Sequence, residues 1–158
     1  MQPIKIIKLV EKFVLNTNAD IKYIGDQAKY LIEMDRIEMP PRNKYFTTKT
    51  STATESYYST LLHELLHWTG HELRCSRKFS QLGENSNYAK EELIAELGAA
   101  FLCADLNITN TPRQDHAQYL NHWLTVIKED PVFLKKSAAL AEKGVDWLNS
   151  LQNDKSAS

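Results

Sequence analysis

The sequence predicts an α+β fold in which a small N-terminal β-sheet packs on a long central helix, followed by a second long helix and two C-terminal helices. Three observations lead to this expectation. Short β-favouring segments gather before residue 40, helical apolar spacing dominates the rest, and the 158 residues are 42% hydrophobic. A chain of this size buries a single core. We therefore expect one domain over residues 1–151 and a frayed polar tail over residues 152–158.

The segment from Met1 to Leu15 is expected to form an amphipathic helix docked on the surface. Its apolar residues follow helical spacing at Ile6, Val10, Phe13 and Val14. Lysines interrupt the apolar run that a secretory leader requires, and no stretch reaches the length of a membrane span. The two cysteines, Cys75 and Cys103, need no disulfide in a reducing compartment. We therefore expect a cytoplasmic protein with no membrane contact.

Three short strands are expected next. Residues 19–25 and 28–33 hold β-favouring side chains on either side of a turn signal, Gly25-Asp26. Asp35 to Met39 alternates as a further strand, which Pro40-Pro41 ends. These segments form the small sheet in front of the central helix.

The central helix is expected to run from Thr52 to about Trp68. Thr52-Ala53-Thr54-Glu55 fits a capping box, and Gly70 supplies an end in the left-handed conformation. The helix has more apolar surface than one face needs, at Leu61, Leu62, Leu65, Leu66 and Trp68. It should therefore be buried against neighbours on several sides.

This helix carries His63-Glu64-Leu65-Leu66-His67. The spacing HExxH places two imidazoles one turn apart on one face with a carboxylate beside them, the ligand pair and general base of a zinc metallopeptidase. A solvated helical face is the alternative interpretation.

The third zinc ligand is expected on the second long helix, because catalytic zinc takes three protein ligands and a water. Its core stripe is predicted at Leu93, Leu97, Ala100, Phe101 and Ala104. Glu92 and Glu96 lie one turn apart along the border of that stripe. We expect Glu92 to ligate the metal and Glu96 to hold a ligating histidine through its free ring N–H, with the reverse order open. Glu91 should point away, as a charge in the first helical turn.

The remaining helices and charges complete the expected surface. Pro112 and Pro131 each follow a capping residue and open the two C-terminal helices.

A net charge of −1 gives no basic footprint for nucleic acid. The basic clusters are expected to be solvated surface, at Arg74, Arg77 and Lys78 and at Lys135 and Lys136.

The runs YSTLLHELLHWTGH from Tyr58 and YAKEELIAELGAAFL from Tyr88 resemble the zincin-like metallopeptidase domain at the C-terminal end of ArdC-type antirestriction proteins. The resemblance extends from about Ala19 to Leu148. The general plan is also similar to that of ImmA/IrrE-type regulatory peptidases. The resemblance implies a zincin-like fold, with one Zn²⁺ per chain held by His63, His67 and the Glu92/Glu96 pair. It further implies an intracellular protein of plasmids, phages and other mobile elements, in a family linked to protecting incoming DNA from restriction.

Members of that family commonly carry an N-terminal domain that binds single-stranded DNA. We expect this chain to begin after that domain, so DNA binding is not expected from this chain alone. The expected partner is a protein or peptide substrate.

The expected reaction is hydrolysis of a peptide bond by metal-activated water, with Glu64 as general base. Tyr88 and His71 are candidates to steady the oxyanion, although Tyr88 could simply pack and His71 could be a partly exposed histidine. The strand Asp35 to Met39 could pair with an extended substrate backbone or be an ordinary edge strand. The alternative function is a non-catalytic, zinc-containing module that acts on restriction or regulatory partners by contact. Glu64 argues against it, because a closed structural zinc site has no use for a base.

Overall fold

A computed structural model describes residues 3–78, 85–108, 124–125 and 127–152. The elements in chain order are α1 (Lys8–Leu15), β1 (Asp20–Tyr23), β2 (Lys29–Leu31), β3 (Arg36–Met39), a 3₁₀ turn η1 (Arg42–Lys44), α2 (Ala53–Thr69), α3 (Asn85–Asp105) and α5 (Phe133–Ser150). The α+β arrangement expected from the sequence, a small sheet followed by long helices, is confirmed. The predicted helix after Pro112 falls largely outside the described residues.

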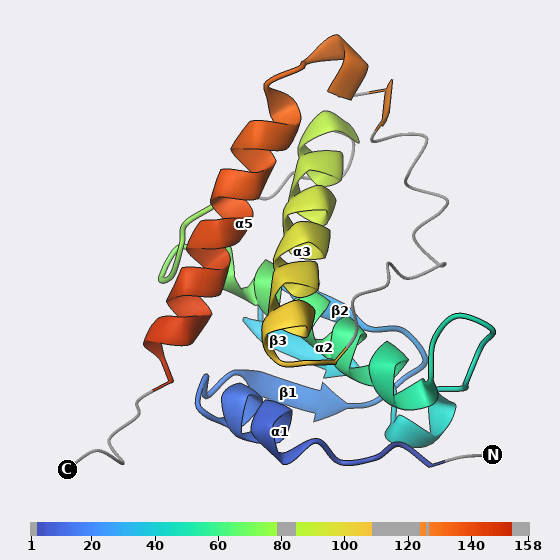
Figure 1. The fold of residues 1–158 in the computed structure, drawn as a ribbon. Helices are drawn as coiled ribbons and strands as arrows, with labels where there is room; N and C mark the ends of the chain where they lie inside the picture. The colour runs from blue at the N-terminus through green and yellow to red at the C-terminus, as the bar shows by residue number, and fades with distance from the viewer. Residues whose placement is uncertain (1–2, 79–84, 109–123, 126, 153–158) are drawn as a thin grey trace.

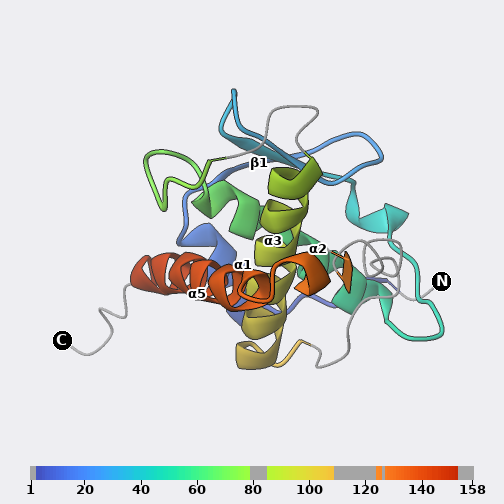
Figure 2. The ribbon, with the colours of Figure 1, turned by 90° about the horizontal axis from the view of Figure 1, so that it is seen from above.

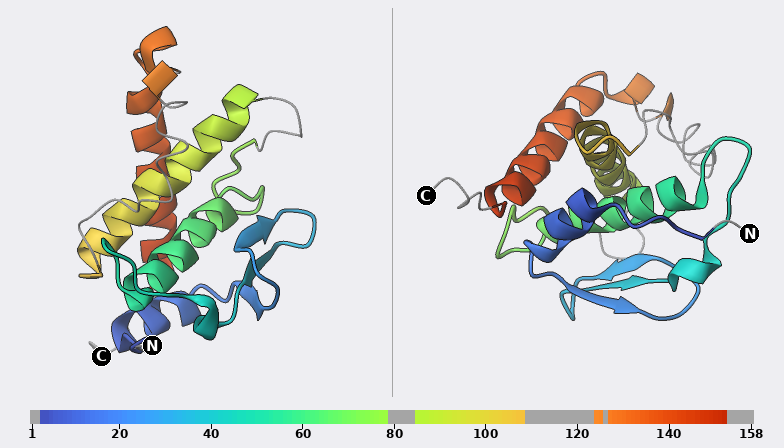
Figure 3. Two further views of the ribbon diagram at one scale, coloured as in Figure 1. Left: turned by 90° about the vertical axis from the view of Figure 1, so that its right-hand side faces the viewer. Right: turned by 60° about the horizontal axis from the view of Figure 1, so that its bottom comes forward.

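Helix α2 lies in the middle of three layers. The sheet covers one side of it, and α3 and α5 stand side by side across the other (Figures 1 and 3). Seen from above, α3 and α5 cross over α2 (Figure 2). The side chains from Leu61 to Thr69 are accordingly all buried. This confirms that the central helix is enclosed on several sides.

The sheet has the strand order β1-β3-β2. β3 pairs in parallel with β1, through Ile37 and Ile21, and antiparallel with β2, through Ile37 and Tyr30. β3 is therefore the central strand, and the expectation that it could be an edge open to a substrate backbone is wrong. Because both of its edges are already hydrogen-bonded, it has no free row of backbone groups to offer.

Helix α2 starts with the predicted capping box. It ends at the predicted glycine, but that glycine does not have the predicted backbone conformation. The Thr52 hydroxyl accepts from the Glu55 N–H at 3.1 Å, and the Glu55 carboxylate accepts from the Thr52 N–H at 3.0 Å. Gly70 does end the helix, but with φ −75° and ψ −10° it is right-handed. The termination is achieved instead by the segment that follows, which folds back on the helix end.

The buried face of α3 differs from the predicted stripe. Ala100 and Ala104 are exposed, and Phe101 is 38% exposed. Between residues 88 and 105 the buried residues are Ala89, Glu91, Leu93, Ile94, Ala95, Gly98, Ala99, Leu102 and Cys103. The stripe was misplaced because α3 packs against both α2 and α5, so that its buried surface is wider than one helical stripe and rotated from the predicted one.

Both ends of the described chain also depart from expectation. Helix α1 begins at Lys8, and Ile6 before it is 69% exposed. Helix α5 begins two residues after Pro131, with the Asp130 carboxylate accepting from the Val132 N–H at 3.1 Å. Gln152, expected in the frayed tail, donates to the Phe13 carbonyl at 3.0 Å. The remaining tail lies outside the described residues.

Candidate metal centre

Two imidazole nitrogens of α2 face each other across a small gap. The Nε2 atoms of His63 and His67 are 3.1 Å apart, and both rings are buried. The arrangement follows from the helix, which places residues i and i+4 one above the other on one face. Two nitrogen lone pairs at this separation require a proton or a cation between them.

Glu92 on α3 closes the third side of this gap. Its carboxylate oxygens lie 3.1 Å from His67 Nε2 and 3.4 Å from His63 Nε2. Among the described residues, His63, His67 and Glu92 form the one group of three whose ligand atoms all lie within 4.8 Å. Ligand atoms bound at about 2.0–2.1 Å to a tetrahedral zinc ion lie roughly 3.3 Å apart. The separations match that value, so the donor set fits a tetrahedral metal ion.

The outer nitrogens of the two rings each meet a further carboxylate of α3. His63 Nδ1 is 2.5 Å from a Glu96 oxygen, and His67 Nδ1 is 3.2 Å from a Glu91 oxygen. A carboxylate can only accept, so each Nδ1 carries a proton, and a metal ion in the gap would take the lone pair of each Nε2. These are the contacts expected if Glu92 is the ligand and Glu96 orients His63. The assignment of ligand roles stays a prediction.

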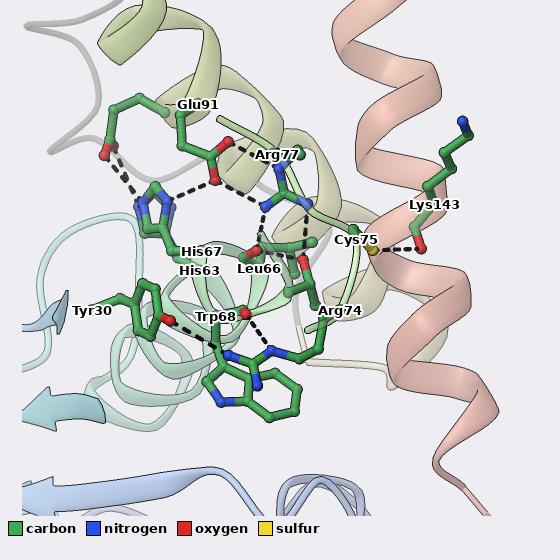
Figure 4. A network of polar contacts seen from close by, with 12 residues as sticks. Tyr30, His63, Leu66, His67, Trp68, Arg74, Cys75, Arg77, Glu91 and Lys143 are labelled. Carbon is green, nitrogen blue, oxygen red and sulfur yellow. Dashed lines mark hydrogen bonds and ion pairs between the residues drawn. The ribbon is translucent and has the colours of Figure 1, made fainter. Parts of the chain in front are cut away.

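Glu91 does not point away, as the sequence analysis expected. It is only 6% exposed and lies between His67 and Arg77 (Figure 4). The expectation failed because α3 begins at Asn85, so that Glu91 lies in its second turn and not in its first. An apolar pattern on α3 that is wider than one stripe was a usable signal, since an acid within a wide buried face is itself covered.

Arg74 and Arg77 are also buried, which corrects their expected place on a solvated surface. Their side chains are 9% and 5% exposed. Arg74 Nε donates to the Trp68 carbonyl and Arg77 Nη2 to the Leu66 carbonyl, both at 2.6 Å. These are among the last carbonyls of α2, which lack the usual backbone N–H partner within the helix, although the Leu66 carbonyl also accepts from the Thr69 hydroxyl. The two arginines therefore cap the helix that carries the histidines.

The surrounding carboxylates shift the pKa values of the site. Burial alone would lower the pKa of His67, but its hydrogen bonds with Glu91 and Glu92 outweigh burial and raise that pKa well above the ordinary value. The pKa of His63 is raised in the same way, against burial, by Glu92 and Glu96. Burial would raise the pKa of Glu92, but its contacts with the two histidines hold that pKa far below its usual range. The site thus favours positive charge where the Nε2 atoms meet, as a cation site must.

Glu64, the predicted general base, is buried at 6% exposure in the HExxH turn. Its charge raises the pKa of both histidines. In an HExxH helix the glutamate beside the first histidine serves as the general base for a metal-activated water, and that role of Glu64 stays a prediction.

Of the two predicted oxyanion partners, one follows α2 and the other lies on α3. His71 follows the end of α2, and its Nδ1 accepts from the Leu73 N–H at 3.1 Å. Tyr88 is 52% exposed on α3, one turn before Glu92. His71 is not part of the group that could hold a metal. Their catalytic roles remain predictions.

Residues 8–140 match the family of zincin-like metallopeptidases. The chain is 34% identical to the uncharacterized protein y4eC of Sinorhizobium fredii over 94% of this chain and 46% of that protein. It is 37% identical to the DNA primase TraC of Escherichia coli over 78% of this chain and 11% of that protein.

Two solved structures have the same fold. Both are of the antirestriction protein ArdC from plasmid R388, one metal-free and one bound to Mn(II). The TM-scores are 0.77 and 0.79 and the identities 35% and 32%, over 96% and 98% of this chain. The chain spans about half the length of ArdC and of y4eC. None of the helices in the described part of the chain combines the length and apolar character that a membrane span requires.

Proposed function

The chain belongs to the zincin-like metallopeptidase family, and from this premise we propose that it hydrolyses peptide bonds with one zinc ion held by His63, His67 and Glu92. The observation that carries the proposal is the convergence of two Nε2 atoms and one carboxylate at 3.1–3.4 Å. The Mn(II)-bound structure of ArdC supports the binding of a divalent metal.

A bound zinc ion would supply Lewis acidity, lowering the pKa of a water toward about 7 and polarising the scissile carbonyl. The chain's own residues do the rest. Glu64 takes the proton of the attacking water and delivers it to the leaving amine. Glu96 keeps the proton of His63 on Nδ1, so that Nε2 remains a ligand atom. The buried surroundings of α2 strengthen each of these electrostatic contacts.

Similarity to an antirestriction protein of plasmid R388 supports an antirestriction role in a mobile element. We propose a protein or peptide substrate, because the chemistry of the site is that of amide hydrolysis. A net charge of −1 offers no general attraction to DNA, so this chain is not proposed to bind DNA by itself.

The deciding experiment is Glu64→Gln. Glutamine keeps the shape of the side chain and removes the base, so zinc content should stay near one per chain while proteolysis is lost. New protein N-termini would be compared in lysates treated with wild type and with the variant. Full antirestriction activity in a variant that retains zinc would contradict the protease proposal. It would favour the alternative, a zinc-containing module that acts by contact.

A further inference from the structure

The proposed chemistry leaves one buried charge pair without a role. Glu91 and Arg77 lie directly behind His67, and their side chains are 7% and 5% exposed. Figure 4 shows Glu91 between the His67 ring and the Arg77 guanidinium. Burying a carboxylate and a guanidinium costs solvation free energy, which an apolar pair would avoid. A pair in this place is therefore expected to serve the site.

The contact between Glu91 and His67 determines which ring nitrogen faces the metal. Glu91 Oε1 lies 3.2 Å from His67 Nδ1. Since the carboxylate has no proton to donate, Nδ1 must donate, and Nε2, which faces His63 and Glu92, is the nitrogen left to bind a metal ion there. Loss of Glu91 would free the ring to rotate or to carry its proton on the wrong nitrogen.

Arg77 holds the Glu91 carboxylate in place. Its Nε and Nη2 donate to Oε2 and Oε1 of Glu91 at 2.9 and 2.8 Å, and two such parallel bonds fix the plane of the carboxylate. The same guanidinium donates to the Leu66 carbonyl at 2.6 Å and to the Thr69 hydroxyl at 3.0 Å. Arg77 is thus bonded both to Glu91 of α3 and to the α2 turn that carries His67.

From this closed set of contacts we infer that Arg77 and Glu91 are positioning residues, which hold His67 in the orientation and tautomer that bind the metal. The inference rests on the proposed metal centre and extends it to the segment between α2 and α3. Outer partners of a ligating histidine typically change metal affinity by about 10–100-fold. We expect a loss of that size when either residue is replaced.

The primary test is Glu91→Gln, with zinc alone as the probe. Glutamine has nearly the same shape, but its amide NH₂ would face an Arg77 donor, and it carries no charge to support His67. The dissociation constant for zinc, measured by competition with a chromophoric chelator at one pH, should rise about 10–100-fold. Nitrogen-15 shifts of the His67 ring should show a loss of the tautomer with the proton on Nδ1.

Arg77→Met is the second test, and Arg74→Met is its matched control. Arg74 is also a buried arginine that caps α2, through the Trp68 carbonyl, and it also pairs with an acid, Asp35. The Cζ atom of Arg74 lies 3.8 Å from the centroid of the Trp68 ring. Arg74 contacts none of the proposed metal ligands. Both variants should lower the unfolding temperature, but only Arg77→Met should weaken zinc binding. Asp35→Asn is the corresponding control for Glu91→Gln.

Equal zinc affinities in wild type and Glu91→Gln would overturn the inference. Equal losses of affinity in Arg74→Met and Arg77→Met would also overturn it, because both would then act through general stability. If Arg77→Met does not fold, Glu91→Gln against Asp35→Asn still decides. A wild type that binds zinc but cleaves no protein would refute the protease proposal and leave this inference standing, whereas a wild type that binds no metal would refute both.

Discussion

Replacing Gly98 by alanine should destabilise the protein, because at Gly98 α3 packs directly against Leu66 of the HExxH helix. A Cβ added at Gly98 would lie 2.5 Å from Leu66 Cδ1 and 2.6 Å from Leu66 Cγ. Leu66 is fully buried. It cannot move toward α5, because its Cδ1 atom packs so closely against Gly144 of that helix that an added Cβ there would lie 2.9 Å from it. The new methyl group must therefore push α3 away from α2 or force Leu66 from its rotamer.

The expected change in the free energy of unfolding is the cost of overpacking minus the gain in helix propensity. Overpacking of a tight core costs up to about 3 kcal/mol. Alanine is favoured over glycine inside a helix by about 1 kcal/mol. We therefore expect Gly98→Ala to lower the free energy of unfolding by about 2 kcal/mol. Ala100→Gly, at an exposed site on the same helix, measures the helix-propensity term by itself.

Urea denaturation followed by circular dichroism gives the free energies of unfolding. The decisive comparison uses Leu66→Ala as a background, because that change removes both clashing carbons. There Gly98→Ala should become stabilising by about 1 kcal/mol, as only the helix-propensity term remains. The packing argument is refuted if Gly98→Ala is as stable as wild type, or if its effect is the same in both backgrounds.

Three further predictions concern the site, the helix start and the response to acid. Glu92→Ala should abolish zinc retention, whereas Glu96→Ala should weaken it by about 10–100-fold, and the opposite order in metal analysis would exchange their roles. Thr52→Ala should lower the free energy of unfolding by about 1 kcal/mol through loss of the capping box, and an unchanged urea midpoint would show that the box contributes nothing. Burial would raise the pKa of Asp35, but its hydrogen bonds with Arg74 and Tyr30 outweigh burial and lower it, so the stability it contributes is present above the unfolded pKa and lost as pH falls through the folded one. The difference in urea midpoint between wild type and Asp35→Asn should therefore shrink from pH 7 to pH 3, and a constant difference would contradict this.

The local features of the molecule could be read from short stretches of sequence. The capping box at Thr52 and the HExxH pair involve residues within four positions of one another, where helix geometry alone fixes which groups meet. The strands were found for a similar reason, because β-favouring residues stand between turn signals. The pairing of those strands was not found, since strand order depends on which segments meet in space.

The residues that sequence reasoning missed are those whose partners lie far along the chain or on another element. Arg74 and Arg77 looked like surface charges because nothing near them in sequence shows that their segment folds back over the end of α2. Glu91 looked like a solvated charge because a single helical stripe was assumed for α3, which is in fact packed on more than one side.

The sequence by itself determined the motif helix, its cap and the acidic pair one turn apart, because backbone geometry repeats regardless of surroundings. Only the tertiary structure decided how α3 is rotated against α2, which brings Glu92 next to both Nε2 atoms and Glu91 behind His67. That rotation depends on the close approach of Gly98 and Gly144 to Leu66. The packing of elements that are distant in sequence determines this rotation of α3 against α2. The local spacing of residues does not encode the angle between two packed helices.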